Sequence, residues 1–178
     1  MARFNSFDTV RPTERLAQKS CSQNAFYLDD EMSGWQFYGN TIRNCSTGVL
    51  LGGGRRNTIR DNVFIGNDLD VHFDDRGLSW QKASCARNCS ASMGTSCFAT
   101  SLAALNATVP GSVYAEHYPE LVHIYDDHPC VPVYNEITGN RYCHKDSATG
   151  GNFINQNDTT IQSWLSHAAN NTEDASLC

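Results

Sequence analysis

The chain lacks a long apolar segment, since none of its hydrophobic runs approaches the roughly 18 residues that a membrane-spanning helix needs. Its first residues, "MARFNSFDTVRP", also lack the apolar core of a secretory signal peptide. Positive charge is scarce: 13 Lys and Arg residues stand against 19 Asp and Glu residues, giving a formal net charge of −6. This balance disfavours non-specific binding to nucleic acids and to anionic membranes. We therefore expect no nucleic-acid partner and no membrane span.

Nucleotide-binding motifs are absent as well. The stretch "GVLLGGGRRN" at residues 48–57 has three consecutive glycines followed by two arginines. It matches neither G-x-x-x-x-G-K-[ST] nor G-x-G-x-x-G, and the segment after it has the pattern of a strand where a phosphate loop requires a helix. No Ser-His-Asp or Cys-His arrangement is recognisable. The glycine run therefore needs an explanation other than phosphate binding.

Cysteine is abundant, with eight residues, and five Asn-x-Ser/Thr sequons begin at Asn44, Asn88, Asn106, Asn157 and Asn170. Both features favour an oxidising compartment, so the sequence predicts a secreted, disulfide-containing glycoprotein whose start lies upstream of this chain. If the protein is instead intracellular, all eight cysteines are expected to be free thiols. Cys85, Cys89 and Cys97 have the spacing C-x3-C-x7-C, which favours disulfides over zinc because the usual two-residue spacing is missing.

A repeat of 22 residues organises the first half of the chain. When residues 27–54 are offset by 22, "FYGNTI" falls on "IRDNVF" and "GVLLG" falls on "DVHFD". Each unit has short strands separated by polar turns rich in Asn and Gly, without helical periodicity. Such a unit is typical of one coil of a parallel β-helix, whose coils stack about 4.8 Å apart. An antiparallel meander with accidental self-similarity is the alternative.

Stacked coils place equivalent residues above one another. We expect the interior ladders Tyr27/Val49/Val71, Phe37/Ile59 and Ile42/Phe64, and a turn ladder of Asn40 over Asn62. The repeat resumes at residues 135–142, where "NEITGNRY" matches "NTIRDNVF" at 57–64. At the start, "RFNSFDTV" is expected to be part of an earlier coil, with Asn5 and Phe7 in the Asn and apolar positions.

The period is lost between Trp80 and Pro132. We expect three parts in a single domain: coils over residues 1–80, a Cys-rich excursion over 81–131, and a returning coil with a C-terminal cap over 132–178. Two helix-like segments, "SCFATSLAALNATV" and "YPELVHIYDD", lie in the excursion, the second with Pro119 at a suitable first position. The tail "TIQSWLSHAANN" predicts a capping helix with one apolar face, formed by Ile161, Trp164, Leu165 and Ala168.

Four stretches of the chain resemble, in order, a family of right-handed parallel β-helix proteins with the pectin-lyase-like architecture. They are "FYLDDEMSGWQFYGNTI", "GVLLGGGRRNTIRDNVFIG", "VHFDDRGLSW" and "YPELVHIYDDHPCVPVYNEITGN". The resemblance implies an all-β, right-handed parallel β-helix of few coils, and identifies the chain with the C-terminal part of longer proteins. It also implies a carbohydrate-active protein that binds a polysaccharide on the outer face of its coils and cleaves it by hydrolysis or β-elimination.

Strand alternation locates a candidate groove. If Val49 and Leu51 point inward, Asp30, Gly52 and Asp74 form an outward column at intervals of 22 residues. Carboxylates two coils apart are about 9.6 Å from each other, at the edge of the ~6.5–9.5 Å separation of inverting glycosidases. The candidate catalytic residues are Asp30, Asp74, His72 and Arg76. The candidate substrate-binding residues are Arg55, Gly52, Gly53, Asp75 and Trp80.

Other roles stay open for the same residues. Asp30 and Asp74 at strand ends are also suited to capping turns, since carboxylates there accept backbone N–H bonds. Ca²⁺ is the one cofactor the sequence suggests, because it binds carboxylate oxygens, and Asp126 and Asp127 offer a further acidic pair. A non-catalytic glycan-binding or structural β-helix module, including a truncated fragment of a longer protein, is the alternative function.

Overall fold

The computed structural model describes residues 2–3, 6–8, 24–89, 97–144, 151–154 and 167–178. The chain forms two compact units. Unit 1 combines Met1–Asp74 with Pro132–Cys178, and unit 2 is Asp75–Val131.

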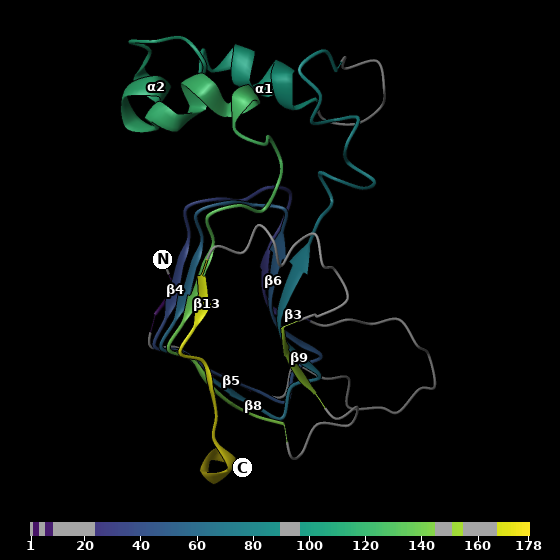
Figure 1. The fold of residues 1–178 in the computed structure, drawn as a ribbon, viewed down its shortest axis with the longest axis vertical. Helices are drawn as coiled ribbons and strands as arrows, with labels where there is room; N and C mark the ends of the chain where they lie inside the picture. The colour runs from purple at the N-terminus through teal and green to yellow at the C-terminus, as the bar shows by residue number, and fades with distance from the viewer. Residues whose placement is uncertain (1, 4–5, 9–23, 90–96, 145–150, 155–166) are drawn as a thin grey trace. The chain divides into compact units, whose positions relative to one another are not determined.

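Unit 1 is built from three sheets in which every pair of neighbouring strands is parallel (Figure 1). Sheet A contains, in spatial order, β1 (Ala2–Arg3), β4 (Gln36–Tyr38), β7 (Thr58–Arg60), β10 (Glu136–Thr138) and β13 (His167–Ala169). Sheet B contains β14 (Thr172–Glu173), β11 (Arg141–Cys143), β8 (Val63–Ile65), β5 (Thr41–Arg43) and β2 (Ser6–Asp8). Sheet C contains β12 (Asn152–Ile154), β9 (Leu69–Asp74), β6 (Thr47–Gly52) and β3 (Asn24–Leu28). The chain visits one strand of each sheet per coil, so unit 1 is a parallel β-helix, as predicted, and the meander is excluded.

The interior is filled by one apolar residue from the centre of each short strand. Phe37 pairs with Ile59 and Ile59 with Ile137, while Ile42 pairs with Phe64. These five side chains are at most 1 % exposed. The predicted ladders Phe37/Ile59 and Ile42/Phe64 are therefore confirmed.

Asparagine ladders hold the corners between sheets A and B. The Oδ1 atom of Asn62 accepts hydrogen bonds from the backbone N–H and the Nδ2 of Asn40, at 2.9 and 3.0 Å. Asn140 accepts the same two bonds from Asn62, and Asn171 accepts them from Asn140. Each amide thus satisfies a backbone donor of the preceding coil that no strand ladder reaches. The predicted stacking of Asn40 over Asn62 is confirmed and extends over four coils.

In sheet C the predicted register is wrong by one residue at its first strand. Tyr27 pairs with Leu50, and Phe26 pairs with Val49. Tyr27 is accordingly 47 % exposed, so the predicted interior ladder Tyr27/Val49/Val71 is in fact Phe26/Val49/Val71. The cause is the corner after β3: between the paired levels Leu28/Leu51 and Gln36/Thr58 it has seven residues, 29–35, where the next coil has six, 52–57. Asp30 (φ 27°) and Glu31 (φ 57°) in this corner are left-handed.

The coil that returns after the excursion follows the predicted match. Ile137 pairs with Ile59, and Asn135 accepts a 2.8 Å hydrogen bond from the backbone N–H of Asn57. At the other end of the stack Phe7 pairs with Ile42, as expected for an earlier coil, while Asn5 lies outside the described residues. The repeat therefore continues on both sides of the segment in which it is lost.

The prediction of a C-terminal helix is wrong where the structure describes it. Residues 167–169 form β13, which pairs in parallel with β10. The reason is Asn171, whose amide continues the asparagine ladder and so defines another coil. Ile161, Trp164 and Leu165 of the predicted apolar face lie outside the described residues. After β14 the chain forms the short helix η3 (Ala175–Leu177), and Cys178 is disulfide-bonded to Cys143 of β11.

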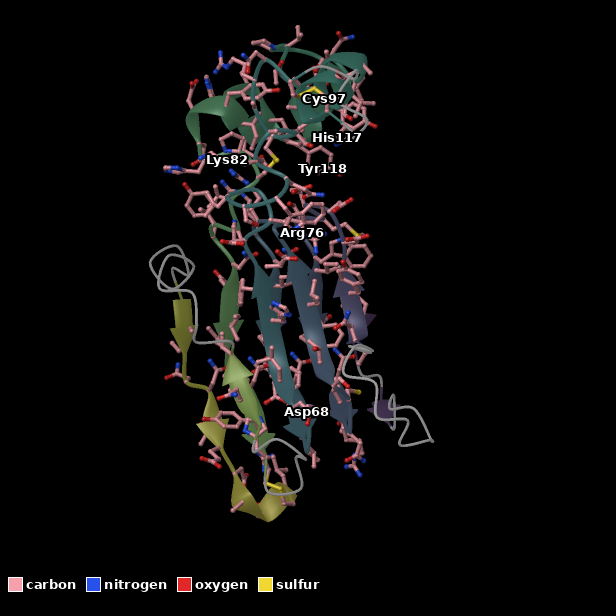
Figure 2. The ribbon with its side chains drawn as sticks, turned by 90° about the vertical axis from the view of Figure 1, so that its right-hand side faces the viewer. Asp68, Arg76, Lys82, Cys97, His117 and Tyr118 are labelled. Atoms are coloured by element: carbon pink, nitrogen blue, oxygen red, sulfur yellow. A yellow bond between two sulfur atoms is a disulfide. The ribbon has the colours of Figure 1, made fainter. Side chains whose placement is uncertain are left out.

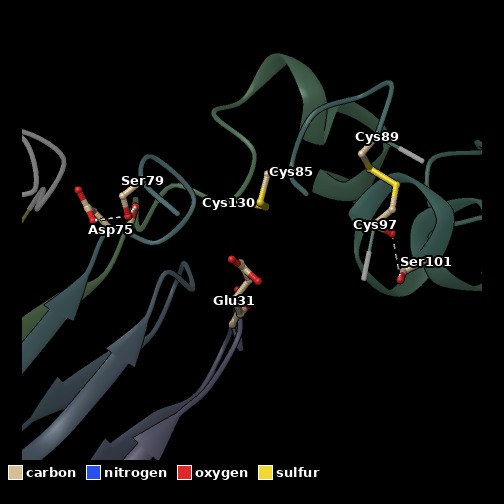
Figure 3. Close-up of a disulfide and its surroundings, with 9 residues drawn as sticks. Glu31, Asp75, Ser79, Cys85, Cys89, Cys97, Ser101 and Cys130 are labelled. Atoms are coloured by element: carbon tan, nitrogen blue, oxygen red, sulfur yellow. Dashed lines mark hydrogen bonds between the residues drawn. A yellow bond between two sulfur atoms is a disulfide. The ribbon is translucent and has the colours of Figure 1, made fainter. Parts of the chain in front are cut away.

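Unit 2 contains the short helices α1 (Phe98–Ala104), α2 (Val113–His117) and the 3₁₀ helix η2 (Pro119–Asp126). Both helix-like segments of the sequence are confirmed, with Pro119 beginning η2 as expected. The core is small, with Leu102, Ala107 and Ile124 buried. Two disulfides, Cys85–Cys130 and Cys89–Cys97, cross-link the unit (Figure 3). These three cysteines of the C-x3-C-x7-C motif therefore form disulfides, as the spacing favoured.

Disulfides are typical of proteins in an oxidising compartment, which agrees with that part of the predicted localisation. Among the described residues, no helix combines the length and the apolar character needed to cross a bilayer.

Candidate functional site

The candidate site of unit 1 is the outer face of sheet C. Val49, Leu51, Val71 and Phe73 point into the core and are at most 1 % exposed, so the residues between them face outward. The register aligns Tyr27, Leu50 and His72 in one outward column. Gly52 pairs with Asp74 in the next column, and both His72 and Asp74 are partly exposed. The predicted outward orientation of His72, Gly52 and Asp74 thus agrees with the pairing.

The acidic column is displaced by one residue from the prediction. Because Leu28 pairs with Leu51, the register puts Asp29, and not Asp30, level with Gly52 and Asp74. The Asp29 carboxylate accepts the Asp30 N–H at 3.0 Å, and the next N–H, of Glu31, bonds to the Gly52 carbonyl at 2.7 Å. Asp29 thus caps the corner after β3, which is the role expected for acidic residues at a strand end. The catalytic role assigned to Asp30 stays a prediction.

The glycine run after β6 has a packing role. Gly53 adopts a left-handed φ of 81°, and a Cβ atom on Gly54 would lie 1.9 Å from the carbonyl oxygen of Met32 in the corner of the previous coil. Only glycine permits two backbones to approach so closely. Arg55 follows with only 7 % exposure, and its N–H bonds to Ser33 Oγ at 3.0 Å. Gly53 and Arg55 therefore belong to the packed corner, and their predicted contact with substrate is untested.

Three of the predicted site residues belong to unit 2. Arg76 is 2 % exposed, and its guanidinium carbon lies 5.5 Å from the centre of the Trp80 ring (Figure 2 labels Arg76). Trp80 itself is 67 % exposed, and Asp75 accepts a 3.0 Å hydrogen bond from Ser79 (Figure 3). Asp75, Arg76 and Trp80 thus form a local cation–π and turn arrangement within unit 2. Their catalytic and substrate-binding roles stay predictions.

The sequence reasoning missed a buried ionisable pair in unit 1. The Oδ2 atom of Asp70 lies 2.7 Å from Nε2 of His144, and the Asp70 side chain is fully buried. Asn67 donates a 2.8 Å hydrogen bond to the other carboxylate oxygen, Oδ1. Burial raises the pKa of Asp70, although the bonds from His144 and Asn67 oppose this shift. The bond to Asp70 raises the pKa of His144 above its ordinary value of 6.5.

One signal in the repeat marks the first partner of this pair. Thr47 pairs with Leu69 and Val49 with Val71, so Gly48 stands level with Asp70. A charged residue, Asp70, therefore stands where the previous coil has glycine. Gly48 itself has almost no free space, since a Cβ on it would be 2.5 Å from the Asp70 carbonyl oxygen. The second partner, His144, follows β11 on the next coil, and no periodicity of the sequence points to it.

The comparisons with known proteins support the fold. Residues 14–91 match the family described as "Periplasmic copper-binding protein (NosD)", a family of parallel β-helix proteins. This match covers less than half of the chain. No curated protein and no solved structure matches. The family match and the three parallel sheets together define a parallel β-helix protein, and the pectin-lyase-like resemblance in particular stays a prediction.

The described residues do not form a site suited to copper. Copper sites in proteins are built from imidazole, thiolate or thioether ligands. Within the described part of either unit taken alone, no three His, Cys, Asp or Glu side chains bring their ligand atoms within 4.8 Å of one another. His144 already uses Nε2 toward Asp70, and six cysteines form disulfides. We therefore assign no chemistry to copper here, and the predicted Ca²⁺ binding at Asp30 and Asp74 remains untested.

Proposed function

We propose that this parallel β-helix binds a polysaccharide across the outer face of sheet C, outside the cell. The observation that carries the proposal is that Tyr27 and His72, both at least partly exposed, lie in one outward column beside Asp74, with Leu50 (8 % exposed) between them. Successive members of a column are about 4.8 Å apart, so the face repeats along its length as a polymer of sugars does. The three disulfides are typical of proteins in an oxidising compartment, in which polysaccharides also occur.

Each member of the face has a distinct use for a sugar chain. The half-exposed ring of Tyr27 offers an apolar surface and a hydroxyl, the combination that favours aromatic residues at wet interfaces. His72 and the carboxylates of Asp29 and Asp74 can exchange hydrogen bonds with sugar hydroxyls. Gly52, between the two carboxylates, adds no side chain, and its backbone is buried with its carbonyl bonded to the Glu31 N–H. The arrangement therefore combines an aromatic contact with polar groups that fix orientation.

Cleavage of the bound chain is the second step that the geometry permits. Asp29 and Asp74 stand two coils apart, about 9.6 Å by stacking distance, which is near the upper limit for an acid and a base acting through water. One carboxylic acid would protonate the glycosidic oxygen while the other carboxylate activates water. Binding does not require Asp29 and Asp74 to be placed as an acid and a base. We therefore propose binding as the function, and the binding experiment below also tests for hydrolysis or β-elimination.

The test measures binding of the full oxidised chain to a panel of uronate-containing and neutral polysaccharides by calorimetry. We expect Tyr27→Ala to weaken binding about three- to tenfold, the value of one aromatic contact. Tyr114→Ala, in helix α2 of unit 2, is the matched control, because Tyr114 is 39 % exposed but lies outside the face. Released reducing ends or unsaturated products, lost in Asp74→Asn, would establish cleavage.

Two results would overturn this function. If no polysaccharide binds, or if Tyr27→Ala and His72→Ala bind as well as the unaltered protein, sheet C is not the binding face. The family match makes Cu²⁺ the necessary comparison ligand in the same calorimeter. Stoichiometric copper binding without any polysaccharide binding would replace the proposal with a metal-binding function.

A further inference from the structure

The Asp70–His144 pair joins two coils at the end of sheet C. Asp70 belongs to β9, and His144 begins the connection from β11 to β12. Strand β12 is the last strand of sheet C, so β9 is its only partner strand in the described residues. Asp70 lies at the beginning of β9, two residues after Asp68, which Figure 2 labels. Besides the strand ladder, the pair thus links β9 to His144, the first residue after β11, through side chains.

The surroundings of the pair are closely packed. The imidazole of His144 lies with its centre 5.2 Å from the ring of Tyr142, which stacks on Phe153 of β12 at 4.6 Å. A Cβ on Gly151 would be 2.5 Å from the His144 ring, so the backbone before β12 lies against the imidazole. The His144 side chain is 11 % exposed as a result. Movement of β12 away from β9 therefore requires the imidazole to leave its position.

The described polar groups around the pair are two carboxylates, on β9 and β14, and one neutral amide in the corner before β9. Asp70 on β9 faces His144 directly, and Glu173 on β14 further raises the pKa of His144. Asn67, in the corner before β9, is a neutral donor to Asp70. Lys145 and Asp146 follow His144 in the sequence and lie outside the described residues. In the buried position the carboxylate and the imidazole hold one proton between them, because a lone buried carboxylate charge is costly.

We propose that the Asp70–His144 pair is a pH-dependent clamp that holds β12 against β9 and loosens as the solution becomes alkaline. Opening exposes His144 to water, where its pKa returns to the ordinary value of 6.5. Between pH 6.5 and the higher pKa of the closed state, opening therefore releases one proton. The opening equilibrium must then increase with pH in this window, by up to about tenfold per pH unit, and level off above it.

The first experiment follows the imidazole signals of the full oxidised chain by NMR. His144 should titrate above 6.5. In Asp70→Asn the carboxylate is lost with little change in shape, and the midpoint of His144 should fall. A His144 midpoint at or below 6.5, or one unaffected by Asp70→Asn, would overturn the clamp.

The second experiment measures hydrogen exchange of the β12 and β9 amides between pH 6 and pH 9. After division by the intrinsic exchange rate, the opening constant of β12 should rise with pH in the unaltered protein and be independent of pH in Asp70→Asn. If Asp70→Asn does not fold, His144→Gln keeps the test possible, because it replaces the more exposed partner and also removes the titration. A pH-dependent opening that persists in the folded variant would show that the pair is only structural. Neither experiment depends on polysaccharide binding.

Discussion

Unit 1 and unit 2 are each stabilised internally by a different kind of interaction. In unit 1 the buried residues repeat from coil to coil, and hydrogen-bonded strands and asparagine ladders connect each coil to the next. In the residues described, unit 2 has a core cluster of only three buried residues, and two disulfides. A stack gains stability from each neighbouring repeat, whereas a unit of this size buries too little surface to depend on its core alone. The comparison predicts that cross-links matter most in unit 2 and buried amides matter most in unit 1.

The largest effect is expected from removing the disulfide that closes unit 2. Cys85 and Cys130 are 45 residues apart in sequence, and chain entropy assigns such a loop about 4 kcal/mol. The double variant Cys85→Ser/Cys130→Ser should therefore lose the exchange protection of α1 and η2, while β7 and β8 keep theirs. Hydrogen exchange by mass spectrometry resolves the two units. Equal loss of protection in both units would show that the disulfide does not stabilise unit 2 selectively.

A somewhat smaller effect is expected from breaking the asparagine ladder. Asn62→Ala removes the acceptor of Asn40 and the donor to the Phe37 carbonyl, and both partners are buried. Unsatisfied buried groups cost about 1–3 kcal/mol each, so unit 1 should lose about 3 kcal/mol of unfolding free energy. Chemical denaturation measures this loss. Asn152→Ala, at an exposed position of β12, is the control and should change stability by less than about 0.5 kcal/mol. A loss of similar size in the control would show that the ladder is not the cause.

The smallest effect concerns the exposed end of unit 1. Bonds from Ser176 and Arg141 lower the pKa of Asp174 from 3.8 to about 2. Because the folded pKa is lowered, Asp174 stabilises the end of the chain above pH 3.8, and this contribution disappears as the pH falls through 2. Asp174→Asn should therefore increase hydrogen exchange of η3 at neutral pH, with little change at pH 2. Increased exchange in the core strands would contradict a purely local role.

Much of the fold could be predicted because the stack repeats its chemistry. The recurrence of Asn40 at Asn62 and of Phe37 at Ile59 identifies the coil, since each ladder needs the same residue type at the same level. The register of β3 could not be predicted in this way. The longer corner after β3 shifts the register of β3 by one residue, which reverses which of its side chains face inward, and Tyr27 is therefore exposed. The extra residue lies in the corner after β3, at the left-handed residues Asp30 and Glu31, and the 22-residue offset does not reveal it.

The candidate site was predicted less completely than the fold. Alternation identified His72, Gly52 and Asp74 as outward-facing, because strand geometry alone decides that orientation. The Asp70–His144 pair was missed because its partners lie on different coils and only Asp70 departs from the repeat. The apolar face of the tail likewise predicted a helix, whereas the single amide of Asn171 places its described part, residues 167–171, in another coil. Side chains that act across coils are thus harder to find than those that recur along them.

The corner between sheets C and A has a consequence for engineering. After β6 the chain needs only residues 53–56 to reach Asn57, yet after β9 it passes through residues 75–134 before Asn135 takes the equivalent position. Both connections end at equivalent positions of the stack, because Asn135 accepts a hydrogen bond from the backbone N–H of Asn57 directly above or below it. The corner therefore tolerates a folded insertion without a change of register. Such a position is a natural graft point, where a foreign domain can be displayed on the stack or the native excursion exchanged for a four-residue turn such as Gly-Gly-Arg-Arg.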